Sequence, residues 1–536
     1  MEGIDYGSVV SPGSIEQSPI SVTTTDVNFT GNWKFFRPLL EKENSPCMNF
    51  CPLNIDIASY FFELNNNNIS RALHILRQAN PIPATLGRIC PHFCLQGCNR
   101  SKFDEAVSIG DIELYLGDKG LNIPYSKPNK WGKHNVAIIG SGPAGIAAAY
   151  YLSKSGVNTT IFEKEVAAGG LLRYGIPSYR LPKDILDAEL NNLIRSLKIE
   201  IINNKEIKNS DLSLLLKDYN FVFSSLGLEE SIVPDNFLKN PKILKGLSVL
   251  NSINKGEIPN GEIFAIVGGG NVAVDVARSL LRLGKKVEII YRRTYEEMPS
   301  YRDEKEEMRK EGIRLRERVL VSKAENYNGK LHLTLVEALN EAGSFKEGKI
   351  IGVKDVDFLI MAIGQKTSIK IPANNRILVG GDYLIGASSV AESIATAKKA
   401  AINILEILEN YDYVKTLKNY DSDKKVINIE QLNLDYIKKS KAINVEYIDV
   451  EERIKSFIPV RGKPSEKEII MEVQRCLNCG KCTGCGICWF FCPDIAISMS
   501  DIEKELKVMI DEEHCKGCGL CSKSCPRGVI KMEENL

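Results

Sequence analysis

The chain has 536 residues, of which 43% are hydrophobic, so it is long enough for three or four domains with real cores. Its net charge is +1 with both signs interspersed, which argues against a nucleic-acid surface or a polybasic membrane anchor. The chain contains no apolar run of about 18 residues, so we expect no membrane span.

The amino-terminal segment is rich in Ser, Thr, Val and Asn and shows neither a basic start nor an apolar run of signal length. We predict a flexible arm over residues 1–35 and a cytoplasmic protein. The 15 cysteines fall into two groups, Cys47 to Cys98 and Cys476 to Cys525. Disulfides would suit a small secreted chain, so we interpret these cysteines as metal ligands. The first group lies in a predicted domain over residues 36–130.

Residues 135–164 have the pattern of a strand, a glycine turn, a helix and a second strand that ends in an acid. The first glycine permits the tight turn, the second lets backbone amides approach a pyrophosphate, and the third lets the helix pack closely. The acid is placed to bind a ribose hydroxyl. The predicted dinucleotide site comprises Gly140, Gly142, Pro143, Ala144, Gly145 and Glu163.

Residues 263–293 repeat this plan, with Gly268, Gly270 and Ala273 at the three turn positions. The second strand ends differently, in Arg292 and Arg293. Guanidinium groups suit the 2′-phosphate of NADPH, whereas an acid would favour NADH. We therefore expect a preference for NADPH, with NADH as the alternative if the arginines are only a solvated surface.

Two such units, the first interrupted by the second, indicate a flavoprotein whose FAD domain is completed after the nicotinamide domain. We predict FAD-binding segments at 131–258 and 366–410, with an NAD(P)H domain at 259–365 between them. Asp382 is placed to bind a ribitol hydroxyl, and a helix from about Ser389 would direct its N-terminus at the flavin.

After a predicted linker over residues 411–475, the segment 476–536 contains the C-x2-C-x2-C-x3-C-P spacing of two-cluster ferredoxins twice. In this arrangement the fourth cysteine of each run binds the other cluster. Zinc sites usually space ligand pairs more widely, so zinc is disfavoured. The predicted ligand sets are Cys482, Cys485, Cys488 and Cys525 for one [4Fe–4S] cluster, and Cys515, Cys518, Cys521 and Cys492 for the other.

The chain resembles the small-subunit flavoproteins of bacterial glutamate synthase. Relatives include the amino-terminal half of dihydropyrimidine dehydrogenase and the large subunit of NADH-dependent ferredoxin:NADP oxidoreductase. The resemblance rests on residues 169–182, 268–278, 291–293, 362–365 and 380–382. It implies that the FAD and NADPH sites also include Gly170, Leu171, Arg180, Gly269, Asn271, Val272, Gly364 and Gly381.

The resemblance also implies a helical amino-terminal domain with two clusters. One cluster would be held by Cys51, Cys90, Cys94 and Glu113. Without the resemblance, Glu113 would be interpreted only as a solvated residue on a helix face. Relatives complete the second cluster with an R-C-x2-C motif before the first cysteine pair, and this chain lacks it there. The sequence RCLNC at 475–479 matches the missing motif, so we expect the second ligand set to be Cys47, Cys98, Cys476 and Cys479. The alternative is that this cluster is incomplete.

The expected fold is thus multidomain α/β: a helical iron–sulfur domain, two nested Rossmann-type domains, and an α+β ferredoxin domain. We predict an oxidoreductase that moves electrons between NADPH, FAD and four [4Fe–4S] clusters and a ferredoxin or a catalytic partner subunit. No side chain is required as a catalytic acid, because hydride transfer needs ring alignment.

Two other functions fit the sequence less well. One is a glutamate synthase small subunit feeding a separate large subunit, and the other is a non-catalytic electron-wire module that docks a partner. A homodimer is also compatible with the sequence. A disulfide reductase is excluded because no C-x2-C lies between Cys98 and Cys476, and pyrimidine reduction would need a further FMN-binding barrel.

Overall fold

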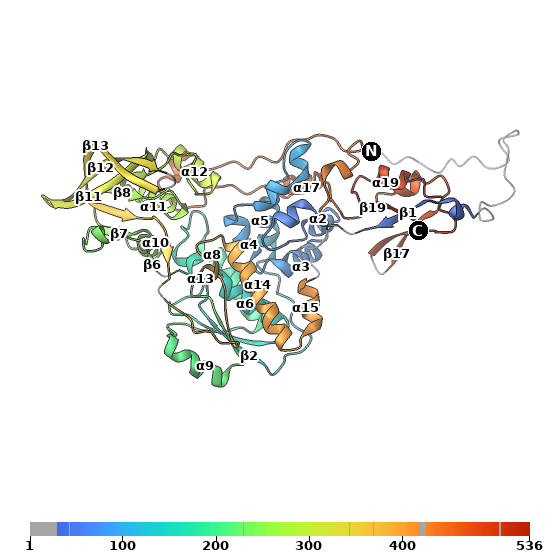
Figure 1. Ribbon diagram of the computed structural model, residues 1–536, viewed down its shortest axis with the longest axis horizontal. Coiled ribbons are helices and arrows are strands. Elements are labelled where there is room, and N and C mark those ends of the chain that lie inside the picture. Colours follow the sequence, from blue (N-terminus) through green and yellow to red (C-terminus); the bar gives the residue numbers. More distant parts are fainter. Residues whose placement is uncertain are drawn as a thin grey trace. The chain divides into compact units, whose positions relative to one another are not determined.

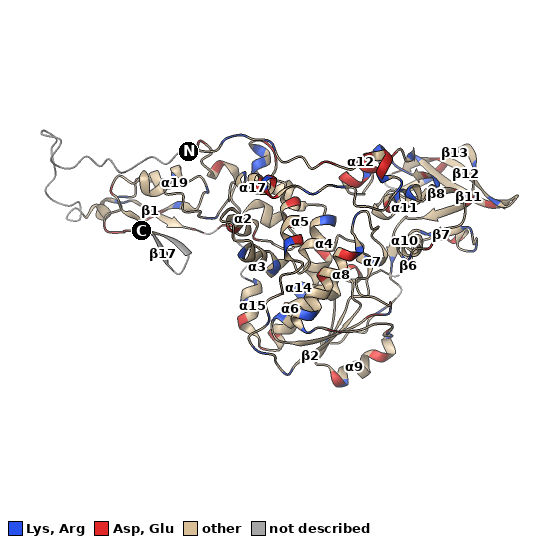
Figure 2. Ribbon diagram, turned by 180° about the vertical axis from the view of Figure 1, so that it is seen from behind, with Lys and Arg blue, Asp and Glu red and all other residues tan. Residues whose placement is uncertain are grey.

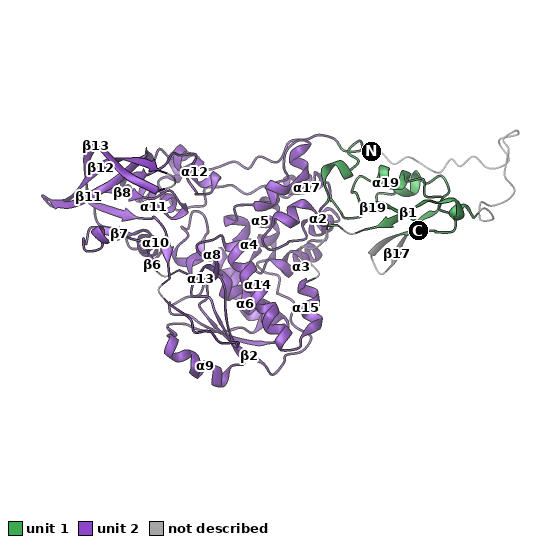
Figure 3. Ribbon diagram, viewed as in Figure 1, with its two compact units in different colours: residues 1–43, 427–437, 479–536 green, residues 44–426, 438–478 purple. Residues whose placement is uncertain are grey.

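The computed structural model describes residues 29–535 except 42, 229, 342–343, 368, 419–424 and 503–504. Two compact units make up the chain (Figure 3). Unit 1 comprises residues 1–43, 427–437 and 479–536, and unit 2 comprises residues 44–426 and 438–478. Most of the predicted arm, residues 1–28, lies outside the described residues. Among the helices that are described, none combines the length and the apolar character needed to cross a bilayer.

Two parallel five-stranded sheets form the nucleotide-binding part of unit 2 (Figure 1). The first has the order β16-β5-β2-β3-β4 and the second β10-β9-β8-β14-β7. Strand β16 belongs to the first sheet but follows all strands of the second sheet in the sequence, so one domain interrupts the other as predicted. The strands of the first sheet are β2 (Asn135–Ile139), β3 (Asn158–Phe162), β4 (Glu200–Ile202), β5 (Phe221–Ser224) and β16 (Ile377–Val379). Those of the second are β7 (Ile243–Lys245), β8 (Ile263–Val267), β9 (Lys286–Tyr291), β10 (Arg314–Glu317) and β14 (Phe358–Met361).

Helices connect these strands, as expected of parallel sheets, whose crossovers need a dozen or more residues. The helices of the two domains are α6 (Pro143–Lys154), α7 (Leu171–Tyr174), α8 (Lys183–Leu197), α9 (Leu212–Asp218), α10 (Gly246–Asn254), α11 (Asn271–Arg282), α12 (Arg302–Lys310), α13 (Asp382–Ile385), α14 (Val390–Ile407) and α15 (Tyr411–Lys418). A two-stranded pair, β6 (Glu230–Ser231) with β15 (Gln365–Lys366), lies between them in sequence.

An antiparallel sheet that the sequence analysis did not predict is inserted in the second nucleotide-binding domain. Its strands are β11 (Val319–Tyr327), β12 (Lys330–Glu341) and β13 (Ser344–Val356). Strand β11 directly follows β10, with Arg318 at φ +57° between them. The sheet therefore begins where the edge strand of the parallel sheet ends.

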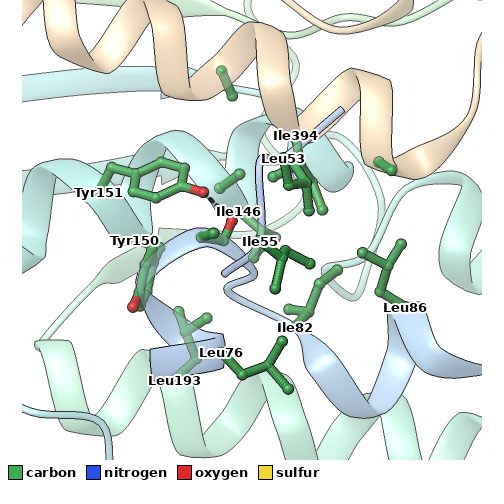
Figure 4. Packing of buried hydrophobic residues seen from close by; sticks show 14 of the residues in the cluster. Leu53, Ile55, Leu76, Ile82, Leu86, Ile146, Tyr150, Tyr151, Leu193 and Ile394 are labelled. Atoms are coloured by element: carbon green, nitrogen blue, oxygen red, sulfur yellow. Dashed lines mark hydrogen bonds between the residues drawn. The ribbon is translucent and has the colours of Figure 1, made fainter. Parts of the chain in front are cut away.

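The helical amino-terminal domain shares one hydrophobic core with the first nucleotide-binding domain (Figure 4). Its helices are α1 (Pro46–Phe50), α2 (Ile57–Asn65), α3 (Ile69–Ala79), α4 (Pro83–Ile89) and α5 (Ile109–Gly120). Tyr150 and Tyr151 of α6 lie fully buried in this core, and the Tyr151 hydroxyl donates to the Ala79 carbonyl at 2.5 Å. The two domains are consequently held in a fixed relation.

Residues 438–478 belong to unit 2 and pack against the rest of that unit at two places. Helix α17 (Glu466–Gln474), which begins with a capping box between Ser465 and Glu468, contacts α2 and α5. Near α16 (Val450–Arg453), the buried Arg453 guanidinium bonds Glu307 of the acid-rich helix α12 (Figure 2) at 2.5 Å. This segment therefore contacts both the helical and the second nucleotide-binding domain.

Unit 1 contains a strand pair that joins the two ends of the sequence. Strand β1 (Phe36–Leu40) pairs antiparallel with β19 (Ile530–Glu534), so that Phe36 lies opposite Glu534. The sequence analysis did not predict this pairing. The domain limits given there stay predictions. The remaining elements of unit 1 are α18 (Ile487–Phe490), β17 (Ile497–Ile502), β18 (Glu505–Ile510) and α19 (Leu520–Ser524).

The buried Glu189 carboxylate of α8 makes stability pH-dependent. It accepts hydrogen bonds from the amides of Ala84 and Thr85 at the start of α4, at 2.7 and 2.8 Å, and burial raises its pKa from 4.5 to about 7. Below pH 4.5 both folded and unfolded chains are protonated there; above it the unfolded chain loses the proton first. This contribution to stability is therefore lost as the pH rises from about 4.5 to about 7.

We expect Glu189→Gln, which cannot titrate, to flatten the fall in stability over that range, by on the order of 3 kcal/mol. The melting temperatures of wild type and variant, measured from pH 4.5 to 7.5, test this. Parallel pH profiles for the two proteins would contradict the assignment.

Candidate functional site

The first glycine turn has the three features that a pyrophosphate cradle requires. Gly140 has φ +90°, a region open to glycine, and a Cβ on Gly145 would lie 1.9 Å from the Gly140 carbonyl oxygen. A Cβ on Gly142 would meet nothing within 4 Å, so this side of the turn is open. Helix α6 begins directly after it, with Pro143 at its first position. The turn thus offers free backbone amides at a helix N-terminus.

Glu163, at the end of β3, supports this turn. Its carboxylate accepts hydrogen bonds from the Ser141 amide at 2.9 Å and the Ser141 hydroxyl at 2.5 Å, and from the Glu165 amide at 2.9 Å. The Ser141 hydroxyl also accepts from the Gly169 amide at 3.0 Å. The acid therefore links the glycine turn to the segment before Gly170, a role for Ser141 that the sequence analysis missed.

The second glycine turn repeats the first in the other domain. Gly268 has φ +142°, and a Cβ there would lie 2.2 Å from the Ala362 carbonyl oxygen, so any side chain is excluded. A Cβ on Gly270 would meet nothing within 4 Å. Helix α11 begins at Asn271, whose side-chain oxygen accepts a hydrogen bond from the Tyr301 amide at 2.9 Å.

Both turns open into one cavity of about 1320 Å³. A volume above the usual 300–1,000 Å³ of a single-ligand pocket is what two dinucleotides would need. All predicted cofactor residues except Gly145 and Ala273 line it, and these two lie beneath the turns in the helices. The lining residues among those predicted are Gly140, Gly142, Pro143, Ala144, Glu163, Gly170, Leu171, Arg180, Gly268, Gly269, Gly270, Asn271, Val272, Arg292, Arg293, Gly364, Gly381 and Asp382.

Asp382 lies at the start of α13, beside the N-terminus of α14. Its carboxylate accepts hydrogen bonds from the hydroxyls of Ser388 and Ser393 at 2.6 and 2.8 Å, and burial raises its pKa. Helix α14 begins directly after Ser389, as expected, and Ser389 caps it in a reciprocal box with Glu392. The helix N-terminus and Asp382 therefore line the same end of the cavity.

Arg180 is placed differently from the other predicted FAD residues. Although it lines the cavity, its guanidinium bonds the Asp275 carboxylate of α11 at 2.7 and 3.0 Å and the Glu304 carboxylate of α12 at 2.8 Å. The side chain thus ties the FAD domain to the nicotinamide domain. A cysteine-rich segment also reaches the cavity, because Ile89 and Phe93, which flank Cys90, line it. Only the position of Phe93 between Cys90 and Cys94 could have indicated this from the sequence.

The first predicted amino-terminal ligand set is brought together in unit 2. Burial, together with the nearby Glu113 carboxylate, raises the pKa of Cys51 to about 11 and of Cys90 to about 12. Cys94 has Cys51, Cys90 and Glu113 as neighbours. Burial raises the pKa of Glu113 to about 7. Cys94 and Glu113 are buried, and Cys51 and Cys90 are half-buried. Four acidic groups in such surroundings ionise together only beside compensating positive charge, which iron would supply.

Cys47, Cys98 and Cys476 pack against the same core of the helical domain. Cys476 follows α17, and the buried Glu472 anchors this helix. The two carboxylate oxygens of Glu472 accept hydrogen bonds from the amides of Ser108 and Ile443, at 2.8 and 3.0 Å. Both Cys47 and Cys476 lie near the buried Tyr60 hydroxyl. Burial raises the pKa of Tyr60, and the two cysteines raise it further. Cys479, the fourth predicted member, belongs to unit 1.

Each predicted ferredoxin ligand set lines its own small cavity in unit 1. Cys482, Cys485, Cys488 and Cys525 line one, and Cys492, Cys515, Cys518 and Cys521 line the other. In the described part of the chain, no group of three or more His, Cys, Asp or Glu is arranged to hold a single metal ion. A cubane makes a different demand, because each ligand binds a separate iron around a shared inorganic core.

This geometry defines a pyridine-nucleotide-dependent flavoprotein oxidoreductase with iron–sulfur domains, and family models agree. Residues 134–385 match the pyridine nucleotide-disulphide oxidoreductase family, although this segment contains no cysteine. Residues 39–123 match dihydropyrimidine dehydrogenase domain II, 4Fe-4S cluster, and residues 481–529 match the 4Fe-4S dicluster domain. Cys476 and Cys479 fall outside all three matched segments.

Comparison with characterised proteins identifies the family. The chain is 30% identical to the NADP(+)-dependent formate dehydrogenase subunit beta of Moorella thermoacetica, over 81% of this chain and 70% of that protein. It is 32% identical to the NADPH-Fe(3+) oxidoreductase subunit beta of Geobacter sulfurreducens, over 63% of this chain and 53% of that protein. It is 29% identical to the glutamate synthase [NADPH] small chain of Escherichia coli, over 68% and 89% respectively. The chain belongs to the glutamate synthase small-subunit-like family of FAD- and NAD(P)H-dependent iron–sulfur oxidoreductases.

The two open glycines allow the dinucleotide sites to be tested separately. Gly142 and Gly270 have φ −66° and −86°, which alanine adopts without strain, so both variants should fold. We expect Gly142→Ala to lower FAD affinity by about tenfold or more, because the methyl group blocks the approach of a pyrophosphate to the backbone. Gly270→Ala should raise the KM for NADPH similarly and leave flavin content unchanged.

Flavin absorbance and NADPH kinetics measure the two effects, and each variant is the control for the other. Loss of flavin from the Gly270→Ala protein would contradict the assignment of the two turns.

Proposed function

We propose that this chain transfers electrons between NADPH, FAD and four [4Fe–4S] clusters, and exchanges them with a ferredoxin or a catalytic partner subunit. The observation that carries the proposal is the single cavity lined by both glycine turns and by Ile89 and Phe93. These two residues flank Cys90, so the predicted flavin site lies next to a predicted cluster ligand. An electron could pass from one to the other without leaving unit 2.

Bound FAD would supply a group that accepts two electrons as a hydride and releases them singly. The chain's own task is then to align two rings and exclude water. The open backbone at Gly142 and Gly270 would hold the two pyrophosphates, and the α14 N-terminus with Asp382 would orient the flavin. Arg292 and Arg293, which line the cavity at the end of β9, would bind the 2′-phosphate.

Sixteen ligands serve four clusters if Glu113 is added to the fifteen cysteines. Cys476 supports the extended set because it packs against the same hydrophobic core as Cys47 and Cys98, although it is far from them in sequence. Cys479 follows three residues later in the sequence. A partner subunit is proposed because two of the relatives are themselves named as beta subunits.

The alternative of a glutamate synthase small subunit is favoured by the 89% coverage of the Escherichia coli small chain. It predicts co-purification with a glutamine-hydrolysing large subunit. The electron-wire alternative predicts that NAD(P)H leaves the flavin oxidised.

We expect anaerobic NADPH to bleach the flavin of the purified chain, and Arg293→Ala to weaken NADPH far more than NADH. Loss of a charge-assisted contact to the 2′-phosphate costs on the order of 1.5 to 3 kcal/mol, about ten- to a hundredfold in KM. Stopped-flow absorbance with both nucleotides measures this. Arg314→Ala, an exposed arginine of the same domain that does not line the cavity, is the control. Equal losses for the two nucleotides would mean that Arg293 does not contact that phosphate.

We also expect about sixteen irons per fully reconstituted chain, because each of four cubic clusters holds four. Replacing Cys476 and Cys479 by Ser should remove roughly four irons and leave the ferredoxin-type signals in electron paramagnetic resonance intact. Cys482→Ser is the matched control, since it should alter those signals. If the double variant instead loses the ferredoxin signals, the cysteines from 476 to 488 have been divided wrongly.

A further inference from the structure

Phe345 of β13 lies against the two arginines at the end of β9. The Arg292 guanidinium carbon is 4.8 Å from the centre of the Phe345 ring, and that of Arg293 is 5.4 Å from it. Cations attract the face of an aromatic ring within about 6 Å. One ring of the inserted sheet therefore contacts both guanidinium groups that line the dinucleotide cavity.

Backbone hydrogen bonds hold the inserted sheet to this segment. The Arg318 amide donates to the Arg293 carbonyl at 3.1 Å, and the Arg318 carbonyl accepts from Ala338 of β12 at 2.8 Å. Strand β12 pairs with β13 so that Asn340 lies opposite Phe345. Arg318 adopts φ +57°, which side chains rarely do, so the connection is made at some cost in strain. The position of Phe345 beside the arginines is thus fixed by the sheet itself.

In the part of the chain that the structure describes, neither Arg292 nor Arg293 forms an ion pair with a carboxylate. The acid that acts on this pair is the exposed Glu297, whose pKa is lowered chiefly by hydrogen bonds from Thr294 and further by the charge of Arg293. Two adjacent guanidinium groups repel each other, and without a restraint their long side chains would extend into water. The face of Phe345 offsets part of that repulsion and leaves the charged edges available to an anion.

We propose that Phe345 is a positioning residue for NADP specificity: it holds Arg292 and Arg293 where the 2′-phosphate of the nucleotide binds. This inference rests on the proposed NADPH function and extends the site to the inserted sheet β11–β13. Residues 319–321 of β11 line the cavity as well, so the sheet forms a wall of the nucleotide site rather than a separate appendage.

The test uses the flavin-loaded protein and two small probes, 2′,5′-ADP and 5′-AMP, which differ only in the 2′-phosphate. Phe345→Leu keeps an apolar side chain but removes the aromatic face. We expect it to weaken 2′,5′-ADP, measured by calorimetry, by about fivefold and to leave 5′-AMP unchanged. The KM for NADPH should rise by a similar factor at constant kcat, and NADH kinetics should not change. Phe345→Tyr, which keeps the ring face, should restore wild-type values.

Tyr327→Leu is the matched control, because Tyr327 is an exposed aromatic residue of the same sheet whose ring contacts His332 rather than an arginine. The inference is overturned if Phe345→Leu weakens both probes equally, or if it weakens neither while Arg293→Ala still weakens 2′,5′-ADP selectively. If the wild-type protein does not distinguish the two probes, the NADPH preference in the proposed function fails, and this inference fails with it. The separate arginine variant therefore shows which of the two is wrong.

Discussion

The structure depends on one shared hydrophobic core that joins the helical domain to the first nucleotide-binding domain. Leu76 and Leu86 of the helical domain pack with Ile146 and Leu193 of the other domain (Figure 4), all essentially inaccessible to water. Polar groups reinforce the contact, because the Tyr150 hydroxyl donates to the Arg77 carbonyl. The two domains do not shift past each other across such a core, because protein interiors are packed as densely as organic crystals. The distance between the cysteine-rich loop after α4 and the dinucleotide cavity is consequently set by packing.

A buried ionic network gives the second nucleotide-binding domain its place within unit 2. Although burial acts in the opposite direction, hydrogen bonds from Arg282 and Arg278 lower the pKa of Glu311 to about 2. Arg278 and Arg453 are almost completely buried, and both bond to carboxylates on or next to α12. Buried charges are tolerated only when paired, so this network specifies one arrangement of α11, α12 and the segment around α16. It does so without taking part in the glycine turns themselves.

The features that the sequence predicted are those encoded by neighbouring residues. The glycine turns, the start of α14 after Ser389 and the two ferredoxin ligand sets each depend on short spacings, and in the structure the residues of each lie close together. Arg180 was assigned to the FAD site by resemblance, yet its guanidinium bonds carboxylates of α11 and α12 that no local pattern connects to it. The sheet β11–β13 and the contact of Phe345 with the arginines were missed for the same reason. Pairings between distant segments leave no periodic signal in a single sequence.

The pairing of β1 with β19 has a consequence for the order in which this protein is made. Arg37 and its ion-pair partner Glu533 are 496 positions apart, and ribosomes add about 5–20 residues per second, so β1 waits on the order of half a minute or more for its partner. During that time its backbone groups are open to other strands, which is a known route to aggregation. Unit 1 is thus completed only after translation has passed residue 530, because β19 supplies the strand that pairs with β1. A chain that ends before residue 530 would therefore lack the strand that pairs with β1 and leave the backbone groups of β1 unsatisfied.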